Sequence, residues 1–114
     1  MTVSFKGYDE KTATFKTQGL CSPGHTVAMA DNATVKPCGD ADNFIGVCVN
    51  VKGEYACVQL GGYAKLAFTG DTAPTVGFCA LTADGKGGVC VAESGRTLLV
   101  TDVDAAGKTV GVIL

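Results

Sequence analysis

The sequence is poor in the residues on which most recognisable functional sites depend. It contains no tryptophan, one histidine and three prolines, and only 18% of its 114 residues are charged. With a formal net charge of −2, it lacks the concentrated positive charge of a nucleic-acid-binding domain. No apolar run approaches the roughly 18 residues that a membrane-spanning helix needs. We therefore expect neither a nucleic-acid nor a membrane partner.

The single histidine restricts the kinds of catalysis available to the chain. A Ser–His–Asp or Cys–His group would have to use His25, and Cys21 is the thiol nearest to it in the sequence. No third residue that would orient the imidazole is indicated nearby, and His25 directly follows a Pro23-Gly24 turn. We interpret His25 as a solvent-facing turn residue and expect no catalytic residue and no enzymatic activity.

The chain has six cysteines, which are Cys21, Cys38, Cys48, Cys57, Cys79 and Cys90. Residues 1–6 lack the basic and apolar regions of a secretory signal, so we expect a reducing compartment and free thiols. No pair has the C-x2-C spacing of zinc sites. The nearest cluster, which contains Cys21, His25 and Cys38, lacks a fourth ligand. We expect neither a metal nor another cofactor.

The hydrophobic pattern favours β-strands over helices. Short runs rich in Val and Thr are broken by Gly, Asp or Asn, which is typical of strands and turns. Strands are expected over residues 25–30, 34–36, 45–51, 54–60, 63–68, 76–82, 88–92, 96–103 and 108–114. Residues 1–19 are interpreted as an N-terminal arm or an edge hairpin, and residues 20–114 as a single β domain. The predicted fold is all-β: a small antiparallel barrel or sandwich built from hairpins.

Residues 44–60 form the clearest predicted hairpin. A two-residue turn at Lys52-Gly53 sets its register. In that register Cys48 lies directly opposite Cys57, at a position where side chains approach closely. This pair would be the one most able to form a disulfide under oxidising conditions.

A second hairpin is predicted around Asp84-Gly85. A two-residue loop there would place Cys79 opposite Cys90, although the following glycines allow a bulge and a shifted register. Glycine also lies between two apolar residues at 45–47, 76–78 and 110–112. Three such kinks would help to bend a sheet into a small barrel, but these short matches do not establish a repeat.

The order of motifs from residue 23 onwards resembles that of small bacteriophage capsid decoration proteins, also called cement proteins. The resemblance rests on residues 23–27 (PGHTV), 44–48 (FIGVC), 56–63 (ACVQLGGY), 76–78 (VGF) and 109–114 (TVGVIL). Like this chain, such proteins are small β proteins rich in Gly, Ala, Val and Thr. The six cysteines depart from the family pattern and suggest a host with a reducing or anaerobic lifestyle.

The resemblance implies a structural virion protein without a catalytic site. Such proteins bind the outer face of the shell formed by the major capsid protein, often as homotrimers at local three-fold positions. They tie neighbouring capsomers together against the pressure of packaged DNA. We therefore expect the chain to be made in the host cytoplasm and to reside on the capsid surface. Residues 1–19 and the loop over residues 71–74 are the expected contact regions.

Two other functions remain open from the sequence. One is a small β-barrel interaction module of a phage tail or baseplate, or a ligand-binding domain. The other is an enzyme or redox protein that uses Cys21 and His25 or a pair of thiols.

Overall fold

The structure, a computed structural model, describes residues 11–114 and contains ten strands and no helix in that range. The strands are β1 (Lys11–Thr17), β2 (Thr26–Asp31), β3 (Thr34–Pro37), β4 (Gly46–Lys52), β5 (Tyr55–Gly61), β6 (Tyr63–Ala67), β7 (Gly77–Ala83), β8 (Val89–Val91), β9 (Arg96–Asp104) and β10 (Thr109–Ile113). The predicted all-β class is confirmed. The bounds of β2 to β10 lie within one residue of the predicted ones, because glycine, asparagine and aspartate end the apolar runs at the turns.

The first strand is part of a barrel wall. β1 pairs with β5 in antiparallel orientation and with β3 in parallel orientation. Residues 11–17, from the segment interpreted as an arm or edge hairpin, therefore contribute a strand with a neighbour on each side. Residues 1–10 of that segment lie outside the described part of the chain.

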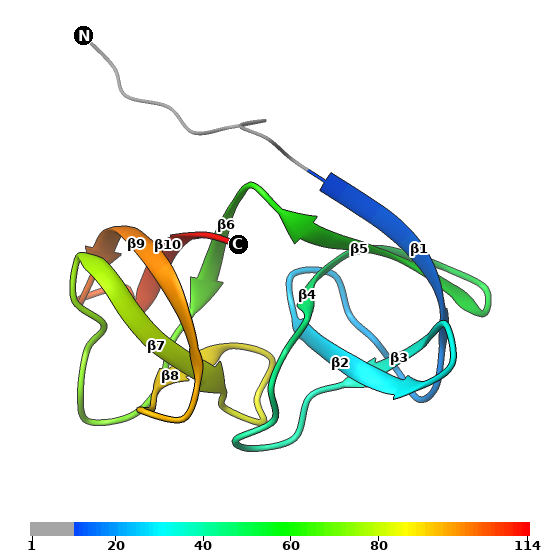
Figure 1. The fold of residues 1–114 in the computed structure, drawn as a ribbon, viewed down its shortest axis with the longest axis horizontal. Coiled ribbons are helices and arrows are strands. Elements are labelled where there is room, and N and C mark those ends of the chain that lie inside the picture. Colours follow the sequence, from blue (N-terminus) through cyan, green and yellow to red (C-terminus); the bar gives the residue numbers. More distant parts are fainter. Residues whose placement is uncertain (1–10) are drawn as a thin grey trace, which may run out of the picture.

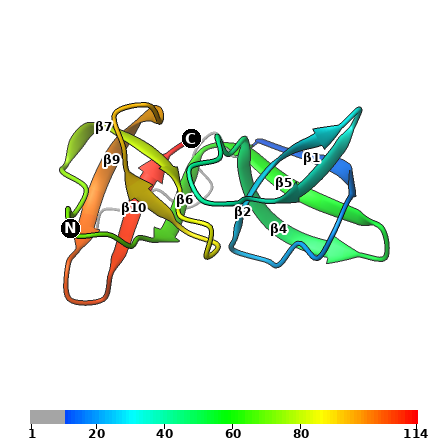
Figure 2. The ribbon, with the colours of Figure 1, turned by 90° about the horizontal axis from the view of Figure 1, so that it is seen from below.

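The ten strands form two five-stranded units that lie side by side (Figures 1 and 2). The first unit, β1 to β5, is a closed barrel with the strand order β1-β3-β2-β4-β5. The second unit, β6 to β10, is a sheet with the order β6-β10-β9-β7-β8. The predicted small barrel is thus present in the first half of the chain.

The two units have the same strand connectivity. In each, the first strand pairs with the fifth, the second with the third and fourth, and the fourth with the fifth, all antiparallel. The first and third strands are joined by a parallel ladder in the first unit and by one parallel bridge, Phe68 to Val89, in the second. The chain therefore contains one five-stranded arrangement twice.

A β-bulge at the same place supports this equivalence. Val49 is the extra residue in β4, and Thr101 is the extra residue in β9, each in the ladder to the fifth strand of its unit. The residue pairs on either side of the bulge therefore correspond between the units. The glycine recurrence seen in the sequence marks a different feature, because Gly46 lies in a fourth strand and Gly111 in a fifth.

The predicted register of the first hairpin is wrong. Lys52 pairs with Tyr55, so the turn consists of the next two residues, and Gly53 adopts a φ of 61° there. The turn shift and the bulge together move the cysteines out of alignment. Cys48 lies opposite Val58, and Cys57 lies opposite a residue on the other side of the bulge, Asn50. The two thiols are not a cross-strand pair.

The two-residue loop that would pair Cys79 with Cys90 does not form, and the hairpin has the shifted register that the following glycines allow. Cys90 lies opposite Thr82, with 3.4 Å between its sulfur and the threonine hydroxyl, and Cys79 lies opposite Leu98. The hairpin loop is longer than two residues because the Asp84 carboxylate accepts hydrogen bonds from backbone N–H groups up to four residues further on. All six cysteines are free.

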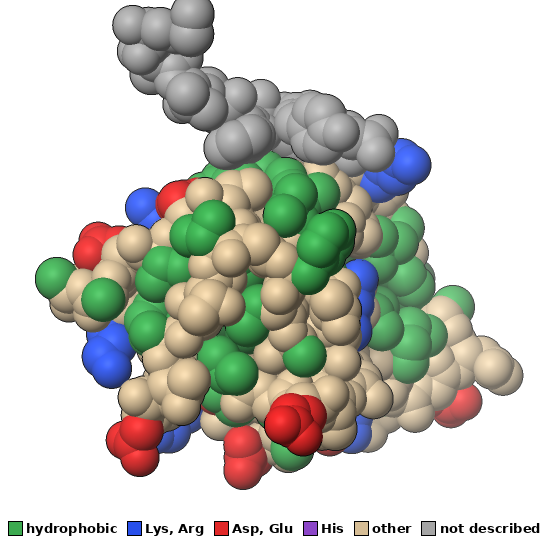
Figure 3. Space-filling model, turned by 60° about the vertical axis from the view of Figure 1, so that its left-hand side comes forward, with side chains coloured by type: hydrophobic (Ala, Val, Ile, Leu, Met, Phe, Trp, Pro, Cys, Tyr) green, Lys and Arg blue, Asp and Glu red, His purple; other side chains and the backbone are tan. Residues whose placement is uncertain are grey.

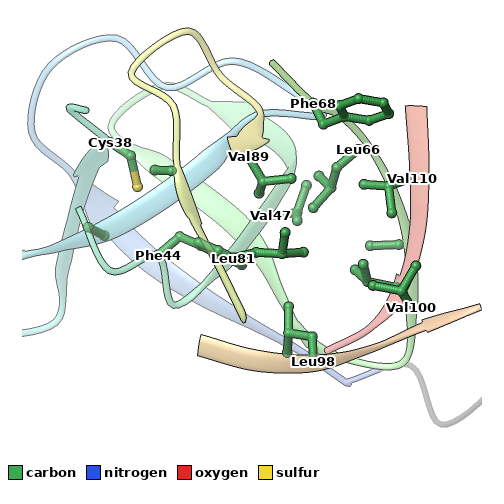
Figure 4. Close-up of a cluster of buried hydrophobic side chains, with 14 residues drawn as sticks. Cys38, Phe44, Val47, Leu66, Phe68, Leu81, Val89, Leu98, Val100 and Val110 are labelled. Atoms are coloured by element: carbon green, nitrogen blue, oxygen red, sulfur yellow. The ribbon is translucent and has the colours of Figure 1, made fainter. Parts of the chain in front are cut away.

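Buried side chains form two clusters, and these are divided unequally between the two units. The smaller cluster lies inside the first barrel and consists of Cys21, Val27, Val35, Cys48, Ala56 and Val58. The larger cluster fills the second unit and also takes in Ala28, Cys38, Phe44 and Val47 from the first (Figure 4). The core of the second unit is therefore completed by side chains from the first.

Polar contacts reinforce this junction. Thr26 in β2 donates its N–H to the Gly87 carbonyl (3.0 Å) and its hydroxyl to the Gly88 carbonyl (3.2 Å) in the β7–β8 loop. The Arg96 guanidinium donates to the Phe44 carbonyl (3.2 Å) and lies 5.2 Å from the centroid of the Phe44 ring. The two units are held together by backbone contacts as well as by a shared core.

Candidate functional site

The outer face of the second unit carries a row of large side chains. The row runs across β7, β9, β10 and β6 through Phe78, Leu99, Ile113 and Tyr63, each paired with the next in the sheet. Residues paired across neighbouring strands point to the same side of the sheet. Phe78 is 79% exposed, Leu99 is 39% exposed, and the other two are half-buried. We call these four residues the apolar row.

A further exposed apolar residue is close in the sequence to one member of this row. Val76, two residues before Phe78, is 70% exposed. Hydrophobic side chains are visible among polar ones over much of the side of the molecule that Figure 3 shows. Contiguous exposed apolar surface on a small protein is typical of an interaction site. The apolar row is therefore our candidate functional site.

The corresponding row of the first unit is covered. Counting from the bulges, Thr26, Val47 and Gln59 occupy the positions of Phe78, Leu99 and Ile113. They are only 1%, 5% and 7% exposed. The second unit covers them: Val47 belongs to the shared core, and the Gln59 side-chain amide donates to the Tyr63 carbonyl (2.8 Å). One position in the fold is thus an internal interface in one unit and open in the other.

The tyrosine end of the row is fixed by polar contacts. The Tyr63 hydroxyl lies 3.2 Å from a carboxylate oxygen of Asp102, which also accepts a hydrogen bond of 2.6 Å from Thr101. The Tyr63 hydroxyl and the Asp102 carboxylate both lie over Gly111, where an added Cβ would collide with them. Burial, followed by the negative charge of Asp102, raises the pKa of Tyr63. The glycine therefore gives the ring and the carboxylate room to meet on this face.

The sequence pattern contained a weak signal for this surface. Leu81 points into the core from β7, whereas Phe78, which is out of phase with it, points outwards. A strand with apolar residues on both faces is covered on both faces in most proteins. The run over residues 76–82 has this property, although the apolar pattern alone predicts no more than a strand there.

A depression on the first barrel is a separate feature. It is lined by Thr14, Asn50, Lys52, Tyr55, Ala56 and Cys57 and has a volume of about 450 Å³. This volume lies in the range of small-molecule sites. The lining is mainly apolar and carries one amine and one thiol that are open to a ligand.

The structure does not assemble a nucleophilic group from Cys21 and His25. Cys21 is buried, and burial raises the pKa of its thiol, whereas a nucleophilic cysteine needs a lowered one. His25 is exposed, as predicted, and its ring lies against Gly87 of the β7–β8 loop. The imidazole therefore packs at the junction of the two units.

Among residues 11–114, no group of three or more His, Cys, Asp or Glu side chains is arranged to hold a metal ion. Cys38 is buried in the shared core. Asp42, four residues further on, accepts a hydrogen bond of 2.8 Å from the Gly39 N–H and so stabilises its own turn. These residues have structural partners.

The loop over residues 71–74, an expected contact region, is mostly open to solvent. Its first three residues are exposed, and Pro74 is buried. The other expected contact region is described only from residue 11 onwards, where it forms β1.

Within the described range there is no helix long and apolar enough to cross a bilayer. No known protein-family model matches the chain, and no curated protein is similar enough in sequence to count as a relative.

Proposed function

We propose that the chain is a capsid decoration protein of a bacteriophage. It binds the outer face of the shell formed by the major capsid protein, acts there as a homotrimer, and stabilises the shell mechanically without catalysing a reaction. The proposal starts from the sequence motifs that resemble this family, between residues 23 and 114.

The apolar row is the structural observation that supports the proposal best. A chain with a low charge and an open apolar sheet face is suited to lasting contact with other proteins, because such a face gains free energy when it is covered. The fold also suits a mechanical role. The two units share one core cluster and several hydrogen bonds, so a load on one unit is passed to the other.

Binding to an assembled shell tests the proposal. The major capsid protein encoded nearest to this chain's gene would be assembled, and unexpanded and expanded shells would be sedimented with the purified protein. We expect saturable binding to expanded shells, with density on their outer surface in cryo-electron microscopy. Binding to tail or baseplate particles, without binding to expanded shells, would instead support an interaction module of another phage structure.

The depression on the first barrel favours a second candidate, a ligand-binding domain. Its volume of about 450 Å³ and its mainly apolar lining suit a small organic molecule. A thermal-shift screen of small molecules on the wild-type protein and on Tyr55→Ala tests this candidate. A ligand that raises the melting temperature of the wild type alone would support it, and the absence of any such ligand would contradict it.

A further inference from the structure

We infer that the apolar row is the surface on which a second copy of this chain docks. The inference deepens the proposed function by naming the face that one copy offers to another, and it rests on that function only where the copies meet on a capsid. It is argued from the equivalence of the two units.

The fold already uses this position for contact with a β unit. In the first unit, the side chains at the corresponding positions are covered by the second unit of the same chain. Thr26 there receives the β7–β8 loop, and Val47 joins the shared core. The second unit has the same connectivity and leaves the same position open. A unit of this kind is therefore the occupant for which the chain itself provides a precedent.

The side chains at the covered and the open positions differ in polarity. The covered positions carry a threonine, a valine and a glutamine, whereas the open ones carry Phe78, Leu99 and Ile113. The open positions are thus more apolar than the covered ones, which reverses the ordinary relation between exposure and hydrophobicity. Aromatic side chains such as Phe78 are enriched in protein interfaces relative to the rest of the surface. They indicate that this face is covered in the working state.

Charge opposes the contact of two copies only weakly. Each copy carries a net charge of −2, so two copies repel weakly at long range. The apolar row itself contains no charged residue, and Asp102 at its edge already accepts hydrogen bonds from Thr101 and Tyr63. Asp102 and Lys65, the charged residues beside the Tyr63 end of the row, are both exposed. Two copies can therefore bury the Phe78 end of the row and leave both charges in solvent, which avoids the cost of burying an unpaired charge.

Site-specific photo-crosslinking tests which molecule lies on the row. A photoreactive benzoyl-phenylalanine would replace Phe78 in one variant and Met29 in a control. Met29 is also an exposed large apolar residue on a strand, but it belongs to the first unit and lies outside the depression described above. Both variants would be irradiated free in solution and bound to expanded shells. We expect the residue-78 variant to give a covalent product of two copies in at least one state and the residue-29 variant to give none.

Charge substitution provides an independent measurement. We expect Phe78→Asp to raise the dissociation constant for self-association about tenfold or more, and Met29→Asp to leave it unchanged. Sedimentation velocity and native mass spectrometry would give the constant and the number of copies. The melting temperature would show that both variants fold, since both side chains are exposed.

The outcomes separate this inference from the proposed function. Crosslinks from residue 78 only to the capsid protein, or to nothing in either state, would overturn the docking of a second copy. Self-association that is lost in Phe78→Asp would support it even if the protein did not bind any shell. Failure to bind shells would then contradict the proposed function alone.

Discussion

The two units follow one plan and differ in how completely each is closed and covered. The first is a closed barrel with a small interior, and its outer row is buried under its neighbour. The second has one parallel bridge where the first has a parallel ladder, contains the larger core, and leaves its outer row open. The same connectivity therefore supports two roles. The outer row of the first unit is used for contact inside the chain, whereas that of the second unit stays open to solvent.

The difference shows that side-chain choice, and not topology, decides which face is available. Gly46 occupies in β4 the position that Leu98 occupies in β9. An added Cβ at Gly46 would collide with the Gln59 carbonyl, whereas the second unit accepts a leucine at its equivalent position. The strands of the first barrel thus approach each other closely at this position. The second unit, in contrast, has room in its interior for a side chain from the first unit.

The largest expected effect tests whether the units unfold together. Phe44 is supplied by the first unit, is 1% exposed, and packs into the core of the second. We expect Phe44→Ala to lower the free energy of unfolding by about 3–5 kcal/mol. Because the cluster spans both units, the loss should shift one cooperative transition in chemical denaturation.

The matched control is Tyr55→Ala, which removes an exposed aromatic ring from the first unit. We expect it to change the free energy of unfolding by less than about 0.5 kcal/mol. A transition in Phe44→Ala that splits, with one half of the chain unfolding at the wild-type denaturant concentration, would show that the units are independent.

A loss of stability of medium size is expected in the hairpin that joins the second and third strands of the second unit. Asp84, between β7 and β8, is buried and accepts hydrogen bonds from the Lys86 and Gly88 N–H groups and from the Thr69 hydroxyl. Removing its carboxylate in Asp84→Ala leaves buried donors without a partner. We expect this variant to lose about 1–3 kcal/mol in the free energy of unfolding.

The counterpart hairpin in the first unit provides the comparison. Asp31 is exposed, and its carboxylate accepts a hydrogen bond of 2.8 Å from the neighbouring Asn32 N–H. Asp31→Ala should cost about 0.5 kcal/mol or less, measured by the same denaturation. Equal losses in the two variants would mean that the buried contacts of Asp84 add no more stability than the exposed turn contact of Asp31.

The smallest effect concerns pH and the interior of the first barrel. Burial, followed by the nearby Cys21, raises the pKa of Cys48 above the ordinary thiol value of 9.0. Below that pH both folded and unfolded chains keep the proton, so this thiol makes no contribution to the pH dependence of stability. Above it the unfolded chain loses the proton first, and stability falls until the pH passes the folded pKa.

Denaturation of the wild type and of Cys48→Ala between pH 8 and pH 10, a range set by the ordinary thiol pKa, checks this expectation. We expect the variant to lose less stability per pH unit, with a difference of at most about 1.4 kcal/mol per unit. Identical slopes would show that the Cys48 proton is not linked to folding.

The strands were predictable because local residues define them. Turn residues such as Asp104 to Gly107 end each apolar run, and the structure follows them closely. The registers were not predictable, because neither the extra residue at Val49 nor the hydrogen bonds that hold the long loop after Asp84 can be read from the apolar pattern. Asp84, for example, is fixed in part by Thr69.

The candidate site was missed for a related reason. Phe78 looks like a core residue in the sequence, and only the assembled sheet shows that it faces outwards. The duplication was hidden because equivalent positions carry unlike side chains, such as Gln59 and Ile113. Identical pairing does not require identical residues when one position is covered and the other is open.

The repeated pairing scheme has a consequence for folding kinetics. β1 and β6 each pair antiparallel with the fifth strand of their own unit, over the same stretch of ladder. During synthesis β5 emerges well before β10, so β1 meets its own partner first. Refolding from denaturant presents both strands at once, so we expect pairing of β1 with β10 to compete there. Synthesis in chain order should favour the native pairing of β1 with β5.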